Sequence, residues 1–107
     1  MQKLQIPDVT HDVAARFNQL ADTWTQETLR LSSITQIVLH PAYQQIIGMG
    51  PGALPLIFAR LADEPGHWFW ALNAITGENP VPAEDLGNIS RMSEVWMGWA
   101  QARGFVE

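Results

Sequence analysis

Residues 51–77, PGALPLIFARLADEPGHWFWALNAITG, decide the fold of this chain. Four apolar residues in the first part lie at helical spacing: Leu54, Ile57, Phe58 and Leu61. Pro55 fits only in the first turn of such a helix, and residues 63–66 have the composition of a turn. Residues 67–76 are apolar nearly all round, which is typical of a helix covered on several sides, and Gly77 suits its C-terminal cap. The stretch therefore predicts two helices joined by a turn.

On the N-terminal side, residues 9–31 predict one long helix, which Asp8 or Thr10 can cap. One face of it carries the apolar residues Val13, Phe17, Leu20, Trp24 and Leu31. Ser32 and Ser33 then start a short helix whose apolar residues are Ile34, Ile37 and Val38. Pro41 must begin a further helix, because an interior proline costs about 3 kcal/mol, and Gly48 ends it.

On the C-terminal side, residues 78–87 contain two prolines and predict an extended loop. Asn88 caps a last helix, which Gly104 ends. Its inward side is expected to carry Ile89, Met92, Val95, Trp96 and Trp99. No segment alternates apolar and polar residues as a strand does.

The chain is therefore expected to be all-α, a compact bundle of about five or six helices, with residues 1–8 as an N-terminal extension. A length of 107 residues suits a single domain, and 47% apolar with 16% charged residues argues against intrinsic disorder.

A family resemblance rests on residues 48–57 (GMGPGALPLI), 61–63 (LAD) and 70–77 (WALNAITG). This pattern resembles a HEAT-like repeat, in which a "G…ALP-L…L-D" helix is followed by a "W/R-x-AL-x-I-G" helix. The resemblance implies that the two helices pack antiparallel. It covers under a third of the chain and one repeat, whereas stacks usually need three or more. The whole chain also resembles small bacterial proteins, which implies no activity.

The composition argues against several classes of function. The net charge of −5 opposes nonspecific nucleic-acid binding, and the absence of cysteine removes disulfides, zinc fingers, iron–sulfur clusters and thiol catalysis. The N-terminal residues lack the apolar core of a secretory signal. Residues 31–59 carry no charge but are interrupted by prolines, glycines and polar residues, so no membrane span is expected. We expect a cytoplasmic protein.

No motif names a reaction, and no cofactor or metal is expected. His11, His40 and His67 are too far apart for a helical metal pair. In a small enzyme, His40 could act as a general base beside Tyr43, which lies one helical turn away. The simpler interpretation is that His40 bonds the freed backbone at a helix start. Ser32 and Ser33 are read as caps, and the glycines at 48–52 as an interhelix turn.

Two features instead indicate a protein-binding surface. Five carboxylates fall between Arg60 and Arg91 with no cation among them: Asp63, Glu64, Glu78, Glu84 and Asp85. They either face a basic partner across adjoining turns or lie on two solvated loops. Trp68 and Trp70 project about 200° apart on a helix, so at least one should reach another layer or the surface. Tyr43 lies in the neutral segment that is the second candidate surface.

These features predict a non-catalytic protein-binding module. The partner is another protein, with a basic one favoured, and the chain would be the neutralising, antitoxin- or immunity-like half of a bacterial pair or a mobile-element inhibitor. The alternatives are the small enzyme and a helical nucleic-acid-binding protein, although the arginines never cluster. Homodimerisation through an apolar face stays open.

Overall fold

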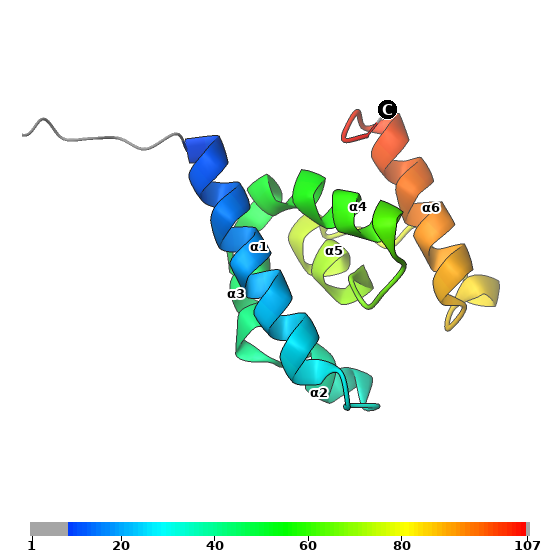
Figure 1. Ribbon diagram of the computed structural model, residues 1–107. Coiled ribbons are helices and arrows are strands. Elements are labelled where there is room, and N and C mark those ends of the chain that lie inside the picture. The colour runs from blue at the N-terminus through cyan, green and yellow to red at the C-terminus, as the bar shows by residue number, and fades with distance from the viewer. Residues whose placement is uncertain (1–8, 107) are drawn as a thin grey trace, which may run out of the picture.

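The computed structural model describes residues 9–106, and every regular element among them is helical. The helices are α1 (Val9–Thr28), α2 (Ile34–Val38), α3 (Pro41–Gly48), α4 (Leu54–Asp63), α5 (Phe69–Thr76) and α6 (Ile89–Ala102), with the short 3-10 segments η1 (Gly50–Ala53) and η2 (Ala83–Asp85). The predicted all-α bundle of five or six helices is confirmed. In Figure 1, α4 lies between α1 on one side and α6 on the other.

Local capping chemistry sets the helix ends where the sequence predicts them. The Ser33 hydroxyl accepts from the Gln36 N–H at the start of α2, and the Asn88 side chain accepts from the Arg91 N–H at the start of α6. Pro41 is the first residue of α3. Gly77 ends α5 with φ of +74°, a left-handed conformation that glycine adopts without steric cost. The proposed cap Asp8 lies outside the described residues.

Two expectations about the apolar faces are wrong. The first helix ends at Thr28 rather than near Leu31, because the chain turns there and the Leu31 N–H bonds the Thr28 carbonyl at 3.0 Å. Leu31 is therefore exposed rather than part of the buried stripe. Ile89 was expected to face inward from α6, but it lies in the first turn of the helix and is exposed on the rim of a groove.

Two groups of aromatic rings organise the core. The first joins α1, α3 and the start of α5 and comprises Phe17, Trp24, Tyr43 and Trp68. The second joins α4 to α6 and the residues that follow it, and comprises Phe58, Trp96, Trp99 and Phe105. Fully burying each such ring contributes roughly 1.5–3 kcal/mol. Four of the five tryptophans thus hold helices together.

Tyr43 joins α3 to α5 through its hydroxyl. It donates to the His67 carbonyl and accepts from the Ala71 N–H, both at 2.9 Å. Ala71 is in the first turn of α5, where amides have no partner within the helix, and the capping residue Trp68 supplies no side-chain bond. Tyr43 therefore caps α5 from another helix.

The α4–α5 pair carries the HEAT-like resemblance. The two helices follow one another and are in contact. Their HEAT-like character stays a prediction. Across residues 9–106, no single helix has both the length and the apolarity to cross a bilayer; α3 and residues 50–63 pass only as a pair bent by 112°.

Candidate partner-binding surface

The predicted site residues separate into buried and exposed groups. Tyr43 is fully buried and Trp68 is 4% exposed, so the expectation that they face a partner as surface residues is wrong. The aromatic group between α1, α3 and α5 holds both rings in place. Trp70 is 58% exposed, which confirms that one of the two neighbouring tryptophans reaches the surface.

The five carboxylates also fall into two groups. Glu78 accepts from Arg103 at 3.1 Å and from the Trp99 indole at 3.1 Å, and the Arg103 hydrogen bond is the main reason that the pKa of Glu78 is lowered. Asp85 pairs with Arg91 at 3.6 Å. Both therefore tie the loop at 78–87 to α6.

The other three carboxylates, on Asp63, Glu64 and Glu84, are exposed and have no hydrogen-bond or ionic partner among residues 9–106. Asp63 and Glu64 precede α5, whereas Glu84 follows it. These three carboxylates therefore come from two separate connections, the one before α5 and the one after it, and each connection carries negative charge without an ionic partner among the described residues.

An apolar groove surrounds the exposed tryptophan. It has a volume of about 260 Å³ and lies between α2, α5 and the start of α6. Its lining is Ile34, Val38, His67, Phe69, Trp70, Gly87, Ile89 and Met92. Ile34 is 59% exposed and Leu86, next to the lining, is 58% exposed. We call the exposed side chains of the lining, those of Ile34, Trp70 and Ile89, the Trp70 patch.

Sequence reasoning found Trp70 but missed the other members of this patch. Ile34 and Ile89 sit at helical positions that match an inward face, and each opens a helix at its first residue. A side chain at the first residue of a helix can extend beyond the surface that the rest of the helix covers. Only the mutual placement of α2, α5 and α6 reveals them as one surface.

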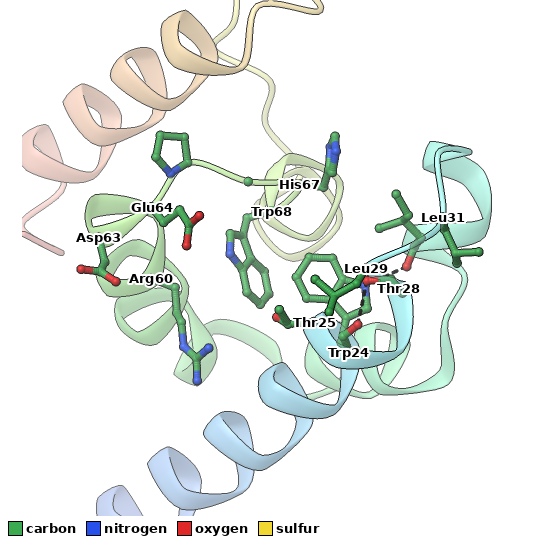
Figure 2. A pocket seen from close by; sticks show the side chains of 13 residues that line it. Trp24, Thr25, Thr28, Leu29, Leu31, Arg60, Asp63, Glu64, His67 and Trp68 are labelled. Carbon is green, nitrogen blue, oxygen red and sulfur yellow. Dashed lines mark hydrogen bonds between the residues drawn. The ribbon is translucent and has the colours of Figure 1, made fainter.

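A second hollow, the turn pocket, lies beneath the α4–α5 turn and has a volume of about 440 Å³. Figure 2 shows its walls: the end of α1 with Trp24, Thr25 and Thr28 on one side, and the segment from Arg60 to Trp68 on the other. His67 lines both this pocket and the apolar groove. The two hollows are therefore neighbours on either side of the start of α5.

The histidine proposed as a base serves the backbone. His40 is the N-cap of α3: its Nδ1 accepts from the Ala42 N–H at 3.0 Å, so the ring proton lies on Nε2 and is donated to Glu27 at 2.7 Å. The Tyr43 hydroxyl is occupied by α5, and burial raises the pKa of Tyr43. In the described part of the chain, no three His, Asp or Glu side chains gather as metal ligands would.

Comparison with family models, with curated proteins and with solved structures gives no match.

Proposed function

We propose that this chain is a non-catalytic module that binds another protein through the Trp70 patch. The observation that carries the proposal is a tryptophan that is 58% exposed beside an apolar groove, whereas the other tryptophans are buried or partly buried against the core. Exposed apolar side chains gathered in one place mark interaction sites, and tryptophan is among the commonest energetic centres of protein interfaces.

The charge distribution favours a basic partner. The chain has a net charge of −5, and Glu84, close in sequence to Gly87 of the groove lining, has no cationic partner within residues 9–106. Attraction between opposite charges speeds encounter more than it strengthens the complex. The partner that fits therefore presents an apolar anchor pocket surrounded by Lys or Arg.

The neutralising role is the form of this function that we favour. A small acidic domain that covers the working surface of a second protein, as an antitoxin or immunity protein does, needs a binding face and no reaction of its own. This part of the proposal rests on the likeness of size, charge and surface to that class.

Site-directed photocrosslinking tests the patch. A photoreactive phenylalanine analogue at position 70, in the full chain in its source cells, should capture one protein. With that protein purified, Trp70→Ala should raise the dissociation rate and weaken binding roughly 30-fold, as loss of an interface anchor worth about 2 kcal/mol does. Glu84→Lys should instead lower the association rate, and this effect should fade at high salt.

Leu39→Ala is the matched control, because Leu39 is an apolar side chain 60% exposed outside the groove lining. It should leave binding within a factor of about two. Equal losses from Trp70→Ala and Leu39→Ala would contradict the proposal. So would a crosslink made only to a second copy of this chain, which would define a homodimer.

A further inference from the structure

The turn pocket contains an indole N–H that no acceptor in the described part of the chain meets. Trp68 is 4% exposed, yet its indole N–H has no hydrogen-bond partner among residues 9–106. By contrast, the Trp24 indole donates to the Ile37 carbonyl at 2.8 Å and the Trp99 indole to Glu78 at 3.1 Å. In Figure 2 the Trp68 indole nitrogen faces the side of the pocket where Glu64 and Arg60 lie. The indole nitrogen is not among the described atoms that are both closed off from solvent and without a partner, so its N–H opens into the pocket and is free to donate to an acceptor from outside the chain.

The polar rim of the pocket is negative. Asp63 and Glu64 contribute two carboxylates that have no partner in the described part of the chain. The one arginine of the lining, Arg60, is already engaged, since it donates to Asp22 and to Asn18 at 3.1 Å each and lies over the Phe17 ring. The charged groups at the pocket that lack an ionic partner are therefore the carboxylates of Asp63 and Glu64.

The inner wall of the pocket is aromatic. The Trp24 and Trp68 rings have centroids 4.7 Å apart and both line it. The Trp68 ring is stacked on Phe17 and on Tyr43, so the two indoles offer a ligand an apolar wall on which the stem of a long side chain can pack. A volume of about 440 Å³ is within the range of roughly 300–1,000 Å³ that is usual for ligand pockets.

We infer that the turn pocket binds a basic peptide segment, with a Lys or Arg side chain against Asp63 and Glu64 and a peptide carbonyl accepting the Trp68 indole N–H. The three features suit three properties of one ligand: a cation, a hydrogen-bond acceptor, and a stem that packs on the apolar wall. An Arg or Lys residue within a peptide has all of them. The inference rests on the proposed function in one respect, that the segment belongs to the partner protein. His67 lies between this pocket and the Trp70 patch, so one partner can reach both.

The test uses the full chain alone and a capped tripeptide, acetyl-Gly-Arg-Gly-amide. In a ¹H–¹⁵N spectrum each of the five tryptophans contributes one indole signal, and Trp68→Phe identifies the one from Trp68. This signal should move progressively as the arginine peptide is added in the millimolar range. The same peptide with citrulline in place of arginine keeps the carbonyls but removes the charge, and it should bind several-fold more weakly.

Substitutions of the two carboxylates test where the cationic side chain of the peptide binds. Glu64→Gln and Asp63→Asn should each weaken the arginine peptide roughly two- to five-fold, as loss of one exposed ionic contact does. Glu84→Gln, at a carboxylate that does not line the turn pocket, is the matched control and should change nothing. A Trp68 signal that does not move with the arginine peptide overturns the inference. So does equal binding of the citrulline peptide, or an equal loss from Glu84→Gln.

This outcome is separable from that of the proposed function. Trp70→Ala should leave binding of the tripeptide unchanged, because Trp70 does not line the turn pocket. If Trp68→Phe does not fold, Trp24→Phe, Trp96→Phe and Trp99→Phe assign the Trp68 signal by elimination, together with the signal of Trp70→Ala.

Discussion

Tyr43 shows how much one polar atom can contribute in this fold. Its hydroxyl satisfies a carbonyl and an amide of the segment that starts α5, and its ring packs on Trp24 with centroids 4.9 Å apart. Sequence reasoning placed Tyr43 on a surface because its partners lie 24 and 28 residues further along the chain. Both bonds are to backbone atoms, so the side chains of His67 and Ala71 give no sign of the contact in the sequence. Such a role cannot be read from spacing.

Tyr43→Phe isolates this contribution, because it removes the hydroxyl and keeps the ring. The Ala71 amide, in a fully buried residue, would lose its acceptor. We expect the free energy of unfolding to fall by about 1–3 kcal/mol, the cost of leaving a buried donor unsatisfied. Urea denaturation monitored by circular dichroism measures it. A loss below about 0.5 kcal/mol would mean that water or another group replaces the hydroxyl.

At the scale of helices, the ends were predictable and the faces only partly so. Ser33, Asn88 and Gly77 act on amides or carbonyls within a few residues, and for this reason the sequence alone locates them. Which side of a short helix is covered depends instead on its neighbours. The same spacing gave correct burial for Ile57 in α4 and incorrect burial for Ile89 in α6.

Two glycine substitutions test the cap of α5 with opposite expected signs. Gly77 has φ of +74°, whereas Gly98 lies within α6 at ordinary helical angles, and a Cβ would meet no atom within 4 Å at either. Gly77→Ala should destabilise by about 1–2 kcal/mol, because only the backbone conformation resists the new side chain. Gly98→Ala should stabilise by about 0.5–1 kcal/mol.

Thermal and urea unfolding of the two variants, measured side by side, give the comparison. A change of the same sign in both would show that the left-handed cap does not control the end of α5.

At the scale of the whole molecule, α6 is held from two sides. Phe58 of α4 contacts the Trp96 and Trp99 rings, and Glu78 beyond α5 contacts both Arg103 and the Trp99 indole. Arg103 also lies over the Trp99 ring, 4.5 Å from its centroid. The polar half of this attachment depends on the ionised form of Glu78.

The attachment should therefore weaken in acid. Because hydrogen bonds from Arg103 and Trp99 lower the pKa of Glu78 in the folded state, its contribution to stability is complete above the ordinary pKa of 4.5. This contribution is lost as the pH falls through the lowered, folded-state pKa. Wild type should thus exceed Glu78→Gln in melting temperature near neutral pH, and the two should converge in acid.

Melting curves across pH values on both sides of 4.5 provide the measurement. Glu84→Gln, which removes a carboxylate that has no partner in the described residues, controls for the change in net charge. A gap between wild type and Glu78→Gln that is constant with pH would contradict this account.

The packing of Tyr43 has an optical consequence. It is the only tyrosine of the chain, and its ring centroid lies 4.9 Å from that of Trp24 and 6.0 Å from that of Trp68. At such separations an excited phenol passes its energy to indole before it can emit. The native protein should consequently show almost no tyrosine fluorescence, and the emission should appear when α3 separates from α1 and α5. The chain thus carries its own spectroscopic reporter of the junction between these three helices.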